Sequence, residues 1–192
     1  MSFRKHNDEG FTGLEAAIVL IAFVVVAAVF SYVVLGAGFF TTQKAQETVY
    51  KGVEQSTTNI QMVGNVYGIS NLTPQTNISE IKFSVGLAPG APTIDLTGMK
   101  IVFSTPNTEP IILTHAVGPN ANATALTFTT KVNGQGDNLN AMEANQQMEV
   151  DFLVAYVAPN TKMTMEMRPS VGAALPFSKT APPTITKTNV LY

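Results

Sequence analysis

The chain has 192 residues, of which only 12% are charged, and its formal net charge is −2. This balance, without any tract rich in lysine or arginine, excludes the electrostatic attraction on which nucleic-acid binding depends. Because the chain has no cysteine, a disulfide framework and a thiolate metal site are also excluded.

A long apolar segment follows a short leader that contains Arg4 and Lys5. Residues 16–43 contain a single ionisable group, the phenol of Tyr32. The run 16–40 exceeds the ~20 apolar residues that a helix needs to cross a bilayer. The two basic residues ahead of it favour a cytoplasmic N-terminus. We therefore expect a precursor that resides in the membrane as a single-span protein.

A lone carboxylate, Glu15, lies at the start of this segment, four residues after Phe11. A secretory signal peptide is cut after its apolar run, whereas the small residue Gly10 lies before it. Cleavage after Gly10 would place a new α-amine on Phe11, about one helical turn from Glu15. An acid beside an apolar span usually has a partner, so this pair, within one chain or between copies, would set the axial register. The simpler alternative is that Glu15 only complements the helix dipole.

The helical pattern continues beyond the apolar run. Apolar residues recur in steps of three, four and seven up to Tyr67, and Glu47 and Lys51 form a supportive pair. Gly68 and Pro74 are signals for its end. The boundaries expected from the sequence are a leader at 1–10, a helix at 11–68, a linker at 69–77 and an outer domain at 78–192.

The outer domain has the pattern of an all-β structure. Apolar and polar residues alternate in about seven short segments, and turn-rich stretches separate them; the clearest are 81–87, 126–132, 147–156 and 163–167. Such spacing is typical of a β-sandwich or Greek-key domain. The expected fold class is α+β: one long N-terminal α-helix followed by an all-β sandwich or Greek-key (Ig-like) domain.

No set of catalytic residues emerges from the sequence. His115 has no cysteine or acid pair near it and is expected on the surface or in a loop. Met163, Met165 and Met167 have strand spacing and are expected in the core rather than in a metal site. The segment 134–138, which contains Asp137, is interpreted as a flexible hairpin loop in preference to a Ca²⁺ or Mg²⁺ site. We therefore expect no enzymatic activity, no cofactor and no metal.

Three Asn-X-Ser/Thr sequons lie in turn-rich stretches, where N-glycans are usually attached: Asn71, Asn77 and Asn122. Each is a candidate glycosylation site, and a surface glycoprotein is the expectation that follows. Pro74 directly after the first sequon makes Asn71 the weakest of the three.

The N-terminal pattern resembles a known signature. Gly10 before Phe11, Glu15 at the fifth position after the cut, and an uncut apolar helix resemble the type IV pilin superfamily. More narrowly, "GLEAAIVLIAFVVVAAVFSYVVLGAGFF" followed by "TTQKAQETV" is similar to the archaellins, the archaeal flagellins, through about residue 70. The lack of cysteine and the number of strands also favour an archaellin over a bacterial pilin.

This resemblance implies a mechanism and a set of partners. A prepilin-type (archaellin) peptidase would cut after Gly10, and a membrane-embedded assembly platform with an ATPase-driven motor would transfer the helix from the membrane into a helical homopolymer. The filament would stand on the cell surface and serve swimming motility. An archaeal type IV adhesion pilin is the nearest alternative, and a single-span membrane-anchored β-sandwich binding module is an alternative of another class.

Overall fold

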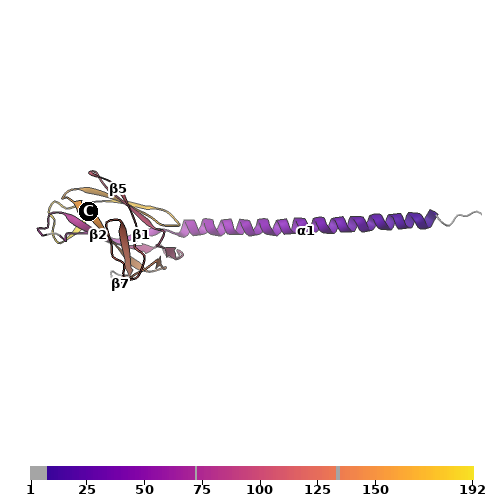
Figure 1. The fold of residues 1–192 in the computed structure, drawn as a ribbon, viewed down its shortest axis with the longest axis horizontal. Coiled ribbons are helices and arrows are strands. Elements are labelled where there is room, and N and C mark those ends of the chain that lie inside the picture. The colour runs from indigo at the N-terminus through magenta and orange to yellow at the C-terminus, as the bar shows by residue number, and fades with distance from the viewer. Residues whose placement is uncertain (1–7, 72, 133–134) are drawn as a thin grey trace, which may run out of the picture. The chain divides into compact units, whose positions relative to one another are not determined.

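The computed structural model describes the backbone of residues 8–71, 73–132 and 135–192, and the side chains within these ranges except 8–12 and 135–137. The chain divides into two compact units, residues 1–51 and 52–192. One α-helix, α1, accounts for the described part of the first unit, and a β-domain dominates the second (Figure 1). The expected fold class, a long N-terminal helix followed by an all-β domain, is confirmed.

Helix α1 runs without interruption from Asp8 to Thr57, 50 residues. At a rise of 1.5 Å per residue its length is about 75 Å. No proline interrupts it, and its alanine, leucine and glutamate residues favour a helix. Its last turn is closed by the hydroxyl groups of Thr57 and Thr58, which donate hydrogen bonds to the carbonyl oxygens of Val53 and Glu54.

The predicted end of the helix at residue 68, and with it the linker at 69–77, is wrong. Residues Ile60–Ile69 form strand β1, which pairs with a strand on each side. The apolar steps that suggested a helix fit a strand with a bulge equally well. The register shifts between Val63 and Val66, and Gly64 adopts a φ of 81° there. The bulge breaks the alternation by which a strand is recognised, so the pattern imitates a helix.

In the described part of the β-domain there are twelve strands, and most of them belong to one sheet. Their bounds are β1 (Ile60–Ile69), β2 (Ile78–Leu87), β3 (Ile94–Asp95), β4 (Lys100–Thr105), β5 (Thr108–His115), β6 (Thr127–Val132), β7 (Gln135–Asn138), β8 (Ala141–Met142), β9 (Gln147–Val157), β10 (Lys162–Arg168), β11 (Leu175–Thr180) and β12 (Thr188–Leu191). The order in the main sheet is β11-β10-β4-β5-β6-β9-β2-β1-β12, with β7 on β6, while β3 and β8 pair separately. The pairing of β5 with β6 is parallel.

The main sheet folds over, so that its two halves face each other. Phe83 of β2 lies edge-on to Phe177 of β11 with ring centroids 5.2 Å apart, and Phe103 of β4 contacts Phe152 of β9 at 5.9 Å. These strands are far apart in the sheet order, so their rings can meet only across an interior. Where the two edges approach, the backbone of Thr180 exchanges hydrogen bonds with the residue that follows β12. The sandwich is therefore one curled sheet rather than two separate ones.

The interior is filled by side chains that alternate along the strands. Met163, Met165 and Met167 of β10 are fully buried, which confirms their assignment to the core. The segment expected to be a flexible loop contributes β7 at 135–138, paired to β6. The side chain of Asp137, on which a cation site in this segment would depend, lies outside the described residues.

Candidate assembly surface

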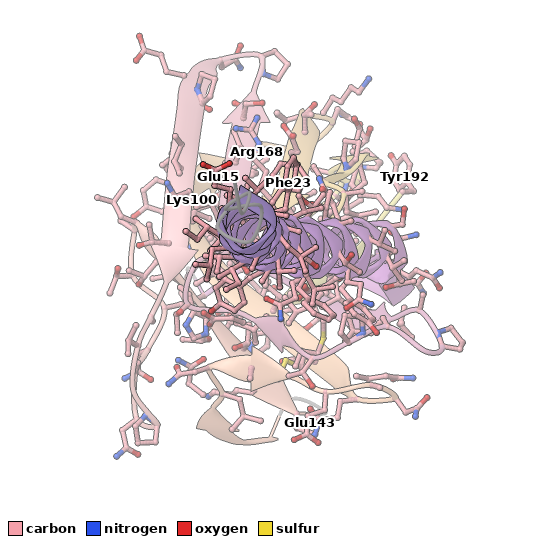
Figure 2. All side chains as sticks on the ribbon, turned by 90° about the vertical axis from the view of Figure 1, so that its right-hand side faces the viewer. Glu15, Phe23, Lys100, Glu143, Arg168 and Tyr192 are labelled. Carbon is pink, nitrogen blue, oxygen red and sulfur yellow. The ribbon has the colours of Figure 1, made fainter. Side chains whose placement is uncertain are left out.

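Helix α1 exposes apolar side chains in every direction. All of its described side chains, residues 13–57, are exposed, including Phe23 at 72% and Tyr32 at 80% of their maximal areas. Viewed along its axis, the helix carries side chains around its whole circumference (Figure 2). It is long and apolar enough to cross a membrane, and none of its most apolar window is buried. A helix that is apolar on all sides requires lipid or other helices around it.

The candidate register residues lie together near the start of α1. The backbone of Gly10 and Phe11 belongs to the helix, and Glu15 follows one turn later on the same side as Phe11. The side chain of Phe11 lies outside the described residues. The Glu15 carboxylate projects away from α1 (Figure 2) and has no ion pair with any described residue. Its pairing with a Phe11 α-amine stays a prediction.

Glu47, in the second half of α1, differs from Glu15 because it has charged partners on the same helix. Glu47 forms ion pairs with Lys44 at 2.7 Å and with Lys51 at 2.8 Å. Hydrogen bonds from Lys44 and Lys51 hold the pKa of Glu47 below its usual value. These groups are exposed, so water screens the attraction. The helix thus changes near residue 43 from a surface suited to apolar surroundings to one suited to water.

The three sequons differ in how free their asparagine side chains are. The Asn71 side chain donates a hydrogen bond to Glu80 at 2.7 Å, and Asn77 is half-buried directly before the buried Ile78. Asn122 is exposed in a loop between β5 and β6. Because a glycan must be attached to an accessible amide nitrogen, Asn122 is the most suitable acceptor.

A half-buried acid pair on the outer side of the sheet was not found from the sequence. Lys82 on β2 forms ion pairs with Glu80 at 2.9 Å and with Asp151 on β9 at 3.5 Å. Burial raises the pKa of Asp151 to about 7, and the neighbouring Glu80 carboxylate adds to this rise. Burial also favours a higher pKa for Glu80, but hydrogen bonds from Lys82, Asp151 and Asn71 outweigh it and lower that pKa. The ion pair at 3.5 Å is too weak to keep Asp151 charged, so near neutral pH the two acids share a proton.

Replacing Asp151 by asparagine is therefore expected to stabilise the domain at high pH. The folded pKa of about 7 lies above the ordinary aspartate value of 3.8, so folding takes up a proton between these values. The stability that this proton brings is complete below about pH 4 and is lost as the pH rises through 7. The difference in unfolding free energy between Asp151→Asn and the native chain should grow in favour of the variant from pH 5 to pH 8.

Urea unfolding of the full chain in detergent at several pH values measures this difference. The control variant is Glu149→Gln, which changes another half-buried carboxylate on the same strand. A difference for Asp151→Asn that stays constant with pH would contradict the assignment of the shared proton.

His115 is buried, contrary to the expectation that it lies on the surface or in a loop. Its side chain is 5% exposed, and its Nε2 lies 2.8 Å from the Thr130 hydroxyl oxygen. That hydroxyl group donates to the Leu139 carbonyl oxygen at 2.8 Å, so Nε2 is the donor to it. Burial lowers the pKa of His115 and favours the neutral ring. The parallel pairing of β5 with β6 brings these residues together, and no local pattern predicts it.

Comparisons with known proteins agree on the family. The family model for archaeal-type flagellin matches residues 10–179. A probable flagellin of Archaeoglobus fulgidus is 40% identical over 204 residues, which cover 100% of this chain and 98% of the relative. A second probable flagellin of the same organism is 36% identical and covers 95% of this chain and 94% of its own length.

A solved filament is similar over nearly the whole chain. The structure of the archaeal flagellum of Methanospirillum hungatei superimposes with a TM-score of 0.72 and 33% identity, covering 94% of this chain and 99% of that one. Its subunit therefore shares both the long helix and the β-domain. The family match, the full-length relatives and the filament structure lead to one conclusion: this chain belongs to the archaeal-type flagellin family and is a structural subunit of the archaeal flagellum filament, which serves motility.

Proposed function

We propose that the subunit polymerises by packing α1 against the α1 helices of other copies, after cleavage between Gly10 and Phe11. The observation that carries this proposal is the apolar surface of α1, exposed on all sides over residues 13–43. Neighbouring helices would form a core from which water is excluded, and the β-domains would form the outer layer. Such a polymer grows because each contact joins two different surfaces and does not close.

The transfer of α1 from the membrane into a filament has a small energetic cost if water is avoided. Exposing apolar surface to water costs about 25 cal/mol per Å². Moving the helix from lipid into a bundle of similar helices exchanges one apolar environment for another. Thr41 and Thr42 are compatible with either environment, because they donate their hydroxyl hydrogens to the carbonyl oxygens of Ala37 and Gly38, within the helix.

The proposed partners follow from this route. A prepilin-type peptidase would act on the Gly10–Phe11 bond on the cytoplasmic side of the membrane. A membrane-embedded assembly platform with an ATPase-driven motor would then move the helix out of lipid. These partners are implied by the family resemblance of residues 10–15, and no cofactor or nucleic acid is required.

Two alternative functions predict different behaviour of α1 and of the cell. An adhesion pilin would use α1 in the same way, but a strain without the gene would then swim normally and fail to attach. A single-span binding module would keep α1 in lipid and keep its leader. The match to a flagellum subunit over both the helix and the β-domain favours the swimming filament.

The decisive experiment is the intact mass of the subunit in filaments sheared from cells. We expect a chain that begins at Phe11, and the same strain should lose swimming when the gene is deleted. A chain with its leader intact, found only in the membrane fraction, would contradict polymerisation through a cleaved α1.

The mass should also reveal which sequons carry glycan. We expect Asn122 to be occupied, because its side chain is exposed in a loop. Asn71 should be unmodified, because its amide nitrogen is engaged by Glu80 at 2.7 Å. Peptide mass spectrometry of the filaments measures both. An Asn122→Gln variant should lose most of the glycan mass, whereas Asn71→Gln should lose little; the reverse result would contradict the ranking.

A further inference from the structure

Helix α1 contains a hollow that combines apolar walls with polar groups. It has a volume of about 560 Å³ and is lined by Phe30, Ser31, Val34, Leu35, Gly38, Phe39 and Thr42. Ser31, Gly38 and Thr42 are seven and four residues apart, so they lie on one side of the helix and form the floor of the hollow. We call this hollow the Gly38 notch. It lies within the stretch 16–43, whose only ionisable group is a phenol.

The notch contains hydroxyl oxygens that can accept a hydrogen bond from another subunit. The Thr42 hydroxyl donates to the Gly38 carbonyl oxygen at 2.8 Å, so its own oxygen still has lone pairs to offer. The Ser31 hydroxyl, which also lines the notch, is a second acceptor. A Cβ atom placed on Gly38 would meet nothing within 4 Å. The absence of a side chain at this position therefore keeps a space open rather than relieving a contact.

The complementary group is the phenol of Tyr32. Its side chain is 80% exposed, and no hydrogen bond joins it to another described residue. The residues one helical turn away from it, Ala28, Val29, Leu35 and Gly36, carry no polar side chain, so in a bundle of helices water cannot satisfy its hydroxyl group. An unpaired hydroxyl group in such surroundings is costly, so the phenol requires an acceptor. Tyr32 lies about 100° around the helix from Ser31 and cannot turn into the notch of its own chain.

We propose that Tyr32 of one subunit inserts into the Gly38 notch of a neighbouring subunit and donates a hydrogen bond to Thr42 or Ser31 there. This inference rests on the proposed packing of α1 helices in the filament core. The occupant is a second copy of this chain, because the chain belongs to a family of filament subunits. The donor and the acceptors also lie in the same ion-free stretch, residues 16–43, which contains no Asp, Glu, Lys, Arg or His.

A second hollow on α1 shows why the Gly38 notch is the matching site. That hollow is lined by Val25, Val26, Val29, Phe30 and Val33, which offer no side-chain acceptor. A phenol placed there would remain unpaired, whereas an aliphatic side chain would fit. The two hollows share Phe30 as their common wall. The contact is therefore selective along the helix and specifies an axial stagger between copies.

The permitted stagger can be bounded. The floor of the notch extends from Ser31 to Thr42, which is about 16 Å along a helix. For two parallel helices, Tyr32 of one lies level with this floor only when the other is shifted along the axis by between zero and about 15 Å toward its N-terminal end. Tyr32 and the Gly38 notch lie on different sides of α1. Each copy can therefore insert its Tyr32 into one neighbour and accept the Tyr32 of another, as an open polymer requires.

The test compares Tyr32→Phe with Tyr50→Phe in filaments purified from cells. Both variants remove one hydroxyl group from an exposed tyrosine of α1, and only Tyr32 lies in the ion-free stretch. We expect both variants to form filaments. At a fixed temperature, Tyr32→Phe filaments should disassemble about tenfold faster than native filaments, and Tyr50→Phe filaments at the native rate. Equal rates for the two variants would overturn the proposal.

A second pair of variants probes the notch itself. Gly38→Ala and Gly52→Ala each add a Cβ that meets nothing within 4 Å in the chain, so each should favour the isolated helix. Between copies, Gly38→Ala narrows the notch and should lower the temperature of disassembly, while Gly52→Ala should leave it unchanged or raise it. If Gly38→Ala and Gly52→Ala filaments disassembled at the same temperature, insertion of the phenol would be contradicted.

The outcome separates this proposal from the polymerisation on which it rests. If the native chain forms no filament with a start at Phe11, the proposed function fails before any variant is compared. If native filaments form and Tyr32→Phe filaments dissociate at the native rate, the notch contact alone is wrong. A helical reconstruction of native filaments gives a third readout, because the Tyr32 ring must lie against Gly38 of a neighbour.

Discussion

Replacing Glu15 by glutamine is expected to abolish the surface filaments while leaving a cleaved subunit in the membrane. Glutamine keeps the size of the side chain and removes its charge, so the variant cannot form the ion pair that we expect between residue 15 and the α-amine of Phe11. That amine would then be enclosed by apolar helices without a partner. Removing one member of a buried ion pair costs about 3–5 kcal/mol. A filament repeats this cost in every subunit, so assembly should fail altogether.

The measurement separates assembly from the earlier steps. Membrane and sheared-filament fractions are compared by immunoblot, and the intact mass of the membrane form shows whether cleavage has occurred. We expect mature Glu15→Gln subunits in the membrane fraction only. Filaments at native levels would show that Glu15 merely complements the helix dipole, an effect of about 0.3–1 kcal/mol.

Two control variants make the result specific to charge and position. Glu15→Asp keeps the charge on a shorter side chain and should support filaments at reduced yield. Glu47→Gln removes an acid from the same helix, where Lys44 and Lys51 pair with it on an exposed surface. An exposed pair contributes only about 0–1 kcal/mol, so this variant should assemble normally.

The N-terminal helix α1 could be predicted from sequence because its signal is strong. An apolar run with no ionisable side chain except the phenol of Tyr32 has few structural solutions, and the helix is the simplest. Its end was misjudged because Thr57 and Thr58 close the last turn through their own hydroxyl groups, without a glycine or proline signal. The bulge at Gly64 then concealed the alternation of β1.

In the β-domain, the long alternating strands were predictable and the short or interrupted ones were not. β9 and β10 alternate cleanly, with every second side chain buried over most of their length. β11 contains Pro176, which argues against a strand on sequence grounds, although an edge position tolerates it. β3 and β8 have two residues each and carry no pattern at all.

The polar groups of the β-domain depend on tertiary contacts that sequence spacing does not contain. Asp151 and Glu80 are 71 positions apart, and only the pairing of β2 with β9 makes them neighbours. The same holds for the engaged side chain of Asn71, which the sequon pattern presents as a free acceptor. The spacing between Glu15 and the predicted cleavage site, in contrast, depends only on the geometry of one helix, α1.

The second large effect is expected in the core of the β-domain, for Phe152→Ala. The Phe152 ring is fully buried on β9 and packs against two other rings. Its centroid lies 6.3 Å from that of Phe83 and 5.9 Å from that of Phe103. It thus joins its neighbouring strand to the opposite half of the curled sheet. Truncation leaves a cavity between rings that two strands hold in place, so the loss should be at the upper end of the usual range, about 3–5 kcal/mol.

Urea unfolding of the full chain in detergent, followed by near-ultraviolet circular dichroism of the tyrosine and phenylalanine side chains, measures this loss. We expect the midpoint for Phe152→Ala to fall by roughly 2 M. Tyr156→Ala on the same strand removes a side chain that is 66% exposed and should shift the midpoint little. An unchanged midpoint for Phe152→Ala would mean that the two halves of the sheet are not held together through this ring.

The two failures should differ in kind, because the two units of the chain are compact separately. Glu15→Gln leaves the outer domain intact and removes a contact between helices, so its product is a stable membrane protein. Phe152→Ala leaves α1 unchanged, so insertion and cleavage should proceed, but the unfolded outer domain should be lost to proteolysis. Cells expressing Phe152→Ala should therefore contain little mature subunit in either fraction, and growth at lower temperature should restore filaments for Phe152→Ala but not for Glu15→Gln.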